Sequence, residues 1–203
     1  MTKDERNEAD GCFSTACSML SEKASPPAMT IFTLGHSTHS LDEFVHLLQI
    51  YAIRLVADVR TIPRSRHNPQ FNDDTLGETL SRHSIRYMPM KNLGGLRRAR
   101  ADSLNTGWEN ASFQGFADYM QTPEFAAAVQ QLIEAAIEKP AAIMCAEAVP
   151  WRCHRSLIAD ALTVRGITVQ HILSRTSARV HTVTPMARVE GTRITYPGQP
   201  ALL

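Results

Sequence analysis

Cysteine is scarce in this sequence. Its four cysteines among 203 residues are too few for the disulfide framework of a small secreted protein. Long apolar runs are also missing, and none approaches the roughly 18–20 residues that a membrane-spanning helix needs. The first twenty residues have mixed charge and lack the apolar region of a signal peptide. We therefore expect a cytoplasmic protein in a reducing environment that does not associate with membranes.

An excess of one charge is missing as well, because the net charge is only +1. The distribution of charge is uneven. Residues 54–100 hold ten lysines and arginines against four acidic residues, a local charge of +6, and the rest of the chain sums to −5. This asymmetry favours an anionic partner, either a small molecule or a nucleic acid. A basic face that only contacts solvent would give the same pattern.

The chain divides into three parts by composition. Residues 1–28 mix charges with serine and small residues and end in two prolines, so we expect a disordered N-terminal extension. Residues 29–174 alternate apolar strand-like and helix-like segments, which predicts a single domain. Residues 175–203 contain only scattered strand-like pieces, and we expect an arm or a tail. The sequence does not indicate an oligomeric state.

The central part predicts a three-layer α/β fold. We expect a mostly parallel sheet of about five strands with helices on both faces, Rossmann-like or rhodanese-like. Ser40 caps the first helix, with Glu43 placed for a capping box. Gly166 is expected to end the last helix. The strands are expected at residues 30–34, 53–59, 85–88, 141–145 and 168–173, and the later helices at 74–82, 113–120, 123–138 and 153–166.

Reactive side chains follow three of these strands. Ligands of parallel α/β sheets bind at the carboxyl ends of the strands, so side chains at these ends are candidates for a common site. The residues are Gly35, His36 and Ser37 after the first strand, Asp58 and Arg60 after the second, and Cys145 and Glu147 after the fourth.

The segment CAEAVPWRCHR, residues 145–155, holds the densest group of reactive side chains. Cys145 lies at a strand end and faces the start of the next helix, where backbone N–H groups would lower the pKa of a thiol. Arg152 and Arg155 could hold a bound oxyanion. We expect Cys145 to be a nucleophile, with Glu147, His154 and His36 as proton carriers. A buried structural cysteine is the alternative interpretation.

The same segment also suggests a metal site. Cys145, Cys153, His154 and His36 could supply four zinc ligands, which would make the protein a metal-dependent hydrolase. The spacing Cys-x₇-Cys-His is not a common zinc spacing, and the sequence has no CxxC. Adjacent residues on a helix also point about 100° apart. We therefore expect neither a metal nor a cofactor and keep the hydrolase as an alternative.

The loop at residues 60–72 is rich in arginine and amide side chains, which suit phosphates and base edges. A non-catalytic nucleic-acid-binding protein is therefore a further alternative, with Arg97 and Arg98 as additional phosphate contacts and Trp108 stacking on a base. An internal salt bridge is the alternative role of Asp58 and Arg60. The expected substrate- or anion-binding residues are Ser37, Asp58, Arg60, Arg64, Arg66, His67, Asn68, Arg152 and Arg155.

Several motifs together resemble a bacterial family, the domain-of-unknown-function family numbered 488. They are TLGHST, DVRTIPRSRHNPQFN, NLGG and CAEAVPWRCHRSLIADAL, and the resemblance runs from about residue 30 to 173. The most specific part is Cys-x-Glu before Cys-His-Arg.

A more distant resemblance is to rhodanese and the cysteine phosphatases. In those proteins too an Asp-Val-Arg follows a strand, and a cysteine starts an anion-binding loop between a strand and a helix. This resemblance implies sulfur or phosphoryl transfer with Cys145 as the nucleophile. The loop here is one residue longer than the phosphatase Cys-x₅-Arg pattern and has no glycine. The combined expectation is a cysteine-dependent enzyme that acts on an anionic substrate by thiol-mediated group transfer or hydrolysis.

Overall fold

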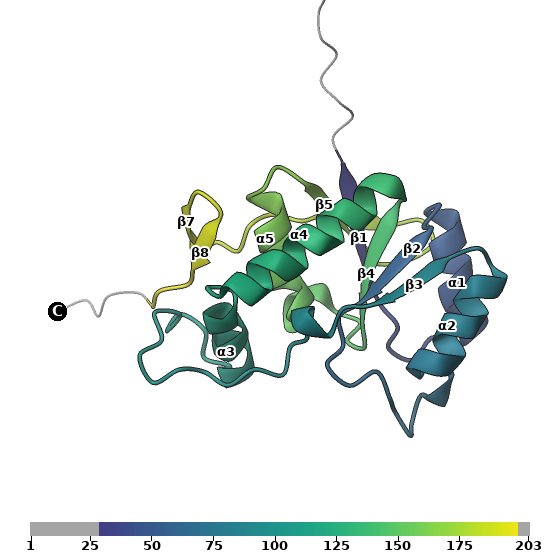
Figure 1. Ribbon diagram of the computed structural model, residues 1–203, viewed down its shortest axis with the longest axis horizontal. Coiled ribbons are helices and arrows are strands. Elements are labelled where there is room, and N and C mark those ends of the chain that lie inside the picture. Colours follow the sequence, from purple (N-terminus) through teal and green to yellow (C-terminus); the bar gives the residue numbers. More distant parts are fainter. Residues whose placement is uncertain (1–28, 199–203) are drawn as a thin grey trace, which may run out of the picture.

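A six-stranded sheet forms the centre of the computed structural model, which describes residues 29–198. The strand order is β3-β2-β4-β1-β5-β6, and Figure 1 shows β3, β2, β4, β1 and β5 in this order. Five strands run parallel, and only β6 is antiparallel to its neighbour β5. The strands are β1 (Thr30–Gly35), β2 (Leu55–Asp58), β3 (Arg86–Pro89), β4 (Ala141–Cys145), β5 (Thr168–Ile172) and β6 (Ala178–Val180).

Helices cover both faces of this sheet, which confirms the predicted three-layer α/β fold with six strands in place of about five. The helices are α1 (Leu41–Ile50), α2 (Asp73–Arg82), α3 (Ala111–Tyr119), α4 (Pro123–Glu138) and α5 (Arg155–Thr163). Three 3₁₀ turns are η1 (Pro69–Phe71), η2 (Lys91–Leu93) and η3 (Pro150–Arg152). Residues 1–28, where we expected disorder, lie outside the described residues.

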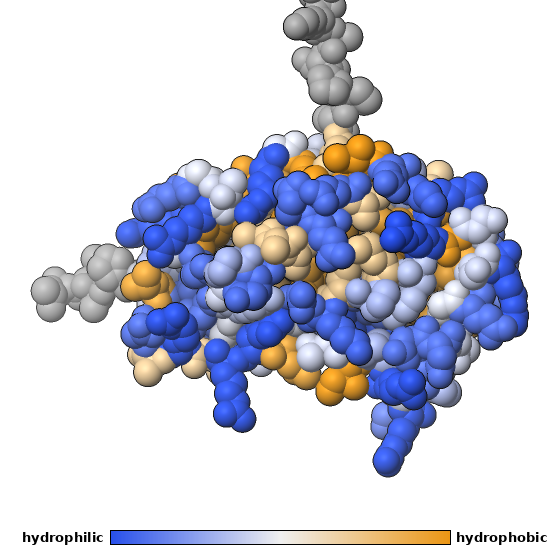
Figure 2. All heavy atoms as spheres, viewed as in Figure 1, coloured by the Kyte–Doolittle hydropathy of each residue, from blue (hydrophilic) through white to orange (hydrophobic). Residues whose placement is uncertain are grey.

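The central strand β4 illustrates how the sheet is buried on both sides. Ala142 and Met144 pack in the cluster that contains α1 and α2, whereas Ala141 and Ile143 pack in the cluster of α3, α4 and α5. Alternate side chains of a strand point to opposite faces, so a strand covered by helices on both faces is apolar throughout. The face of the molecule seen in Figure 2 is mostly hydrophilic, with small separate apolar patches. Among the described helices, none combines the length and apolarity of a membrane span.

The start of α5 differs from the prediction. We expected this helix to begin at Cys153, but it begins at Arg155, and Cys153 is extended with φ −129° and ψ 143°. The turn η3 precedes it and is closed by a hydrogen bond from Cys153 N to Pro150 O. After the helix, Gly166 has φ +79°, as a C-terminal glycine requires. Cys153, two residues before α5, is therefore free of helical geometry.

The last described residues pack on the domain. We expected an arm or tail from residue 175 onward; the structure places β6 at the edge of the main sheet and a hairpin of β7 (Arg188–Glu190) and β8 (Arg193–Thr195) after it. Tyr196 is fully buried, and its hydroxyl donates a hydrogen bond to Asp160 Oδ2 of α5. The C-terminal segment thus contributes to the core.

The neighbouring strands β1 and β4 mark a topological switch point. The chain leaves β1 through α1 on one face of the sheet and leaves β4 through α5 on the other face. In α/β sheets, a crevice forms where the connections of adjacent strands diverge in this way. The crevice here lies between Gly35 and Cys145, which are paired at the ends of the two strands.

Candidate functional site

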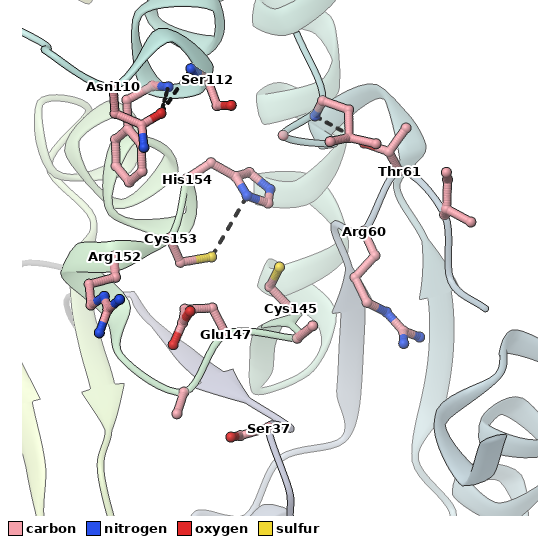
Figure 3. A pocket seen from close by; sticks show the side chains of 16 residues that line it. Ser37, Arg60, Thr61, Asn110, Ser112, Cys145, Glu147, Arg152, Cys153 and His154 are labelled. Carbon is pink, nitrogen blue, oxygen red and sulfur yellow. Dashed lines mark hydrogen bonds between the residues drawn. The ribbon is translucent and has the colours of Figure 1, made fainter. Parts of the chain in front are cut away.

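A cavity of about 590 Å³ opens at the carboxyl ends of β1 and β4. Its walls come from the loop between β4 and α5 and from the loops that follow β1, β2 and β3, together with the start of α3. Figure 3 shows this cavity. The lining residues are Ser37, Arg60, Thr61, Ile62, Gly95, Leu96, Asn110, Ser112, Phe113, Cys145, Ala146, Glu147, Ala148, Arg152, Cys153 and His154.

Gly35 allows the loop after β4 to lie directly on the end of β1. A Cβ atom at this position would be 2.0 Å from the carbonyl oxygen of Glu147, a contact that no side chain permits. The backbone N–H groups of His36 and Ser37 donate to the carbonyls of Cys145 and Ala146, each at 2.9 Å. These contacts fix the position of Cys145, and they explain why glycine ends the first strand.

Cys153 and His154 form a contact pair at the cavity wall. The sulfur of Cys153 is 3.7 Å from Nδ1 of His154, as the dashed line in Figure 3 shows. The other ring nitrogen, Nε2, is 3.2 Å from the carbonyl oxygen of Val59. A carbonyl can only accept a hydrogen bond, so Nε2 carries a proton and Nδ1 of the neutral ring faces the thiol as an acceptor. His154 is thus placed to take the proton of Cys153.

Arg155 connects the same sulfur to the loop after β4. Its side chain is 1% exposed. Nε donates to Cys153 Sγ at 3.4 Å, and the terminal nitrogen donates to the carbonyls of Glu147 and Ala148. We expected Arg155 to hold a substrate anion. The structure instead occupies its guanidinium with backbone carbonyls and a sulfur, and it does not line the cavity.

The two thiols differ in their ionisation. The adjacent Cys145 thiol, together with His154 and Arg155 and against the effect of burial, lowers the pKa of Cys153 below its usual range. The proximity of Cys153, together with burial, raises the pKa of Cys145 above its usual range. We expected a lowered pKa at Cys145, whereas the lowered pKa belongs to Cys153.

Three potential metal-binding atoms lie close together. The ligand atoms of Cys145, Cys153 and His154 are within 4.8 Å of one another. From the sequence we expected Cys153 and His154 to lie on a helix, with side chains that diverge too far to bind one ion. Both residues precede α5, so this objection to a metal does not hold. His36, the fourth ligand considered from the sequence, is outside this group.

His36, Asp58 and Arg60 form a separate buried cluster. Arg60 donates to both carboxylate oxygens of Asp58, and Tyr87 OH donates to the same carboxylate. The His36 ring stacks on Phe71 at 4.2 Å, and its Nε2 is 3.3 Å from an Arg60 nitrogen. The internal salt bridge considered from the sequence is therefore present, and Arg60 contributes to the cavity wall while its guanidinium points away from the sulfurs (Figure 3).

The remaining predicted residues divide between the cavity and the surface. Ser37, Glu147 and Arg152 line the cavity with Cys145. Arg64 lies 3.4 Å from Asp73 and 3.8 Å from Asp74, outside the cavity. Arg66, His67 and Asn68 do not line it either. The structure thus brings only part of the predicted anion-binding set to the thiols.

Two of the residues proposed for nucleic-acid binding, Arg97 and Trp108, are engaged within the protein. The guanidinium of Arg97 lies 3.7 Å from the centre of the Tyr119 ring and donates to the carbonyls of Asn92 and Gly94. Trp108 packs on Phe113 and Tyr196. Stacking on a base would require Trp108 to leave these contacts.

Gly95 is a site residue that the sequence reasoning did not single out. A Cβ atom here would lie 2.5 Å from Nδ1 of His154, so the absence of a side chain lets the imidazole reach Cys153. The motif NLGG, which carries part of the family resemblance, contained this signal. Asn110 and Ser112, at the start of α3, were also missed because they are far in sequence from the cysteines.

A family model covers more than half of the chain. Residues 40–162 match the model described as Domain of unknown function DUF488. The chain belongs to the DUF488 family. The match includes the cavity residues from Arg60 to His154, and it confirms the resemblance found in the sequence. Searches of curated proteins and of solved structures gave no significant match.

Acidification is expected to destabilise the fold through two buried histidines. Burial, with a smaller effect of Arg60, lowers the pKa of His36 to about 4, and burial with His181 lowers that of His171 to about 4. Between pH 6.5 and 4 the unfolded chain binds protons that the folded chain does not, so the free energy of unfolding falls as pH falls. The expected loss is about 1–3 kcal/mol per histidine by pH 4.

Urea unfolding at a series of pH values measures this effect. The variant His171→Gln should be less stable at pH 7 but should lose less stability on acidification. An unfolding free energy that stays constant from pH 7 to pH 5 would contradict the expectation.

Proposed function

We propose that this protein is a cysteine-dependent enzyme in which Cys153 is the nucleophile and the substrate is an anion. The observation that carries the proposal is the position of the Cys153 sulfur, in contact with His154 Nδ1 and Arg155 Nε at the wall of the cavity. The sequence alone favoured Cys145. The contacts favour Cys153, with Cys145 as a neighbouring thiol that supports its negative charge.

The chemistry follows from the two partners of the sulfur. His154 accepts the thiol proton on Nδ1, and the thiolate attacks an electrophilic centre of the bound substrate while the leaving group departs. The covalent intermediate on sulfur is then transferred to an acceptor or hydrolysed by water, which restores the thiolate. Arg155 and the N-terminus of α5 stabilise the anionic sulfur before attack.

An anionic substrate is supported by the lining of the cavity. Arg152 lines the cavity with an exposed guanidinium that has no intramolecular ion pair among the described residues. The hydroxyls of Ser37 and Ser112 and the amide of Asn110 add neutral polar groups. Arginine forks hold carboxylates and phosphates in a bidentate manner, so Arg152 is the residue most able to select a negative charge.

Alkylation of the metal-free protein tests the proposal without knowledge of the substrate. The other two cysteines of the chain, Cys12 and Cys17, are first replaced by serine. This protein is treated with a chelator and then with either iodoacetate or iodoacetamide, and peptide mass spectrometry locates the label. We expect Cys153 to react first, at least about ten-fold faster than a free thiol of pKa ~8.5 at pH 6. His154→Asn should slow both reagents, whereas Arg152→Ala should slow only the anionic one.

The variants Cys145→Ser and Cys153→Ser separate the two thiols. Loss of rapid labelling in Cys153→Ser, with labelling retained in Cys145→Ser, is the expected pattern. Labelling of Cys145 before Cys153, or a Cys153 that reacts like a free thiol, would overturn the proposal.

A further inference from the structure

Three side chains that bind soft metals converge on one point of the cavity wall. The ligand atoms of Cys145, Cys153 and His154 lie within 4.8 Å of one another, and Cys153 Sγ is 3.7 Å from His154 Nδ1. Zinc binds thiolate sulfur at about 2.3 Å and imidazole nitrogen at about 2.0–2.1 Å with tetrahedral angles, which separates two ligand atoms by roughly 3.5–3.8 Å. The observed sulfur–nitrogen distance falls in this range.

The three ligands stand on well-fixed backbone. Cys145 ends β4, where its carbonyl accepts a hydrogen bond from the N–H of His36. Cys153 is extended and His154 is the residue before α5, so their side chains turn toward each other instead of diverging as they would on a helix. Figure 3 shows both sulfurs beside the imidazole. Little movement is needed to place an ion between them.

His154 has the outer contact that metal-binding histidines commonly have. Its Nε2 donates to the carbonyl of Val59, which leaves the lone pair of Nδ1 directed at the sulfurs. A backbone carbonyl on the far ring nitrogen fixes the tautomer and the orientation of a ligating imidazole. Arg155 Nε donates to the Cys153 sulfur and orients it in the same way. The hydrogen bonds of His154 and Arg155 thus favour coordination of one ion by His154 Nδ1 and the Cys153 sulfur, which face each other.

The ligand types and the open side of the cluster indicate which ion binds. Two thiolates and one imidazole favour zinc over magnesium or calcium, which prefer oxygen. All three residues line the cavity, so a fourth coordination position faces solvent or a bound anion. We propose that Cys145, Cys153 and His154 bind a zinc ion that blocks the thiol chemistry of Cys153; the blocking role rests on the function proposed above.

Zinc blocks the thiol chemistry because it occupies the electron pairs that this chemistry needs. Cys145 and Cys153 both bind as thiolates, so any thiol proton is released to solvent when the ion enters. The lone pairs of the Cys153 sulfur and of His154 Nδ1 are then donated to zinc. The nucleophile and its base are lost together, while the fold around them is unchanged.

Zinc titration of the chelator-treated protein tests the site directly. The Cys12→Ser/Cys17→Ser protein is titrated with Zn²⁺ in competition with a chromophoric chelator, and Co²⁺ is used in parallel for its absorption spectrum. We expect one ion per chain and a tetrahedral cobalt spectrum with sulfur charge-transfer bands. Cys145→Ser, Cys153→Ser and His154→Asn should each weaken zinc binding about ten-fold or more, whereas His83→Asn, at an exposed histidine, should not.

Protection from alkylation tests the block. One equivalent of zinc is expected to slow the labelling of Cys153 at least about ten-fold, and excess chelator should restore it. Equal zinc affinity with and without Cys145 would overturn the site, and one-to-one binding with unchanged labelling would overturn the block. Slow labelling of the metal-free protein would instead count against the proposed function, so the two failures can be told apart.

Discussion

Replacing Asp160 with alanine is expected to lower the free energy of unfolding by about 3–5 kcal/mol. The carboxylate is fully buried and accepts four hydrogen bonds, from His181 Nε2 at 2.7 Å, from Thr184 N and Oγ1, and from Tyr196 OH. Alanine would leave these donors buried without an acceptor, and each unsatisfied group costs about 1–3 kcal/mol. The carboxylate joins α5 to the C-terminal segment, so its loss should also loosen that segment.

Urea unfolding measures the loss, and hydrogen exchange of residues 178–196 locates it. Asp102→Ala is the matched control, because Asp102 pairs with Arg100 on the surface with 72% of its side chain exposed; no measurable change is expected there. An Asp160→Ala protein that unfolds at the same urea concentration as the unaltered chain would show that the network is unimportant for stability.

Gly95→Ala is expected to slow the alkylation of Cys153 about ten-fold at pH 7, because the sulfur loses an imidazole contact that helps to lower its pKa and the thiolate fraction falls. The added methyl group would lie 2.5 Å from His154 Nδ1 and 2.7 Å from Cγ, so the imidazole must turn away from the sulfur. The ring moves more easily than backbone does, and the fold should therefore persist. The readout is the rate of iodoacetamide labelling at pH 7, with circular dichroism as the check on folding.

A double variant shows whether Gly95 acts through His154. If it does, Gly95→Ala adds nothing to the loss already caused by His154→Asn. Gly77→Ala serves as the matched glycine control, because a Cβ atom there meets only the Tyr87 ring at 3.4 Å. Equal rates for Gly95→Ala and the unaltered protein would mean that the imidazole is not needed close to the sulfur.

The sheet and its helices were predictable because they depend on local patterns. The capping box between Ser40 and Glu43 was predicted and is present, with both of its hydrogen bonds. The apolar run that ends at Cys145 became the central strand β4. Apolar periodicity and caps are properties of neighbouring residues, and a single sequence records them fully.

The details of the site depend on contacts that no local pattern records. A two-residue error at the start of α5 was enough to misdirect the side chains of Cys153 and His154, and with them the argument about metal binding. The carbonyl of Val59, which orients the imidazole, is 95 residues away in sequence. Similarly, the charge on Arg64 is offset by Asp73 and Asp74 only after folding. Site chemistry is set by such distant pairs.

The central position of β1 affects how the chain can fold during synthesis. This strand pairs only with β4 and β5, so Ile31 cannot pair until Ala141 and Val169 have been synthesised. At about 5–20 residues per second, the ribosome needs several seconds to reach the second partner. Until then Ile31 and Leu34, both buried in the finished protein, remain exposed on the nascent chain. The strand made first is thus among the last to find its neighbours, which favours slow folding and dependence on chaperones.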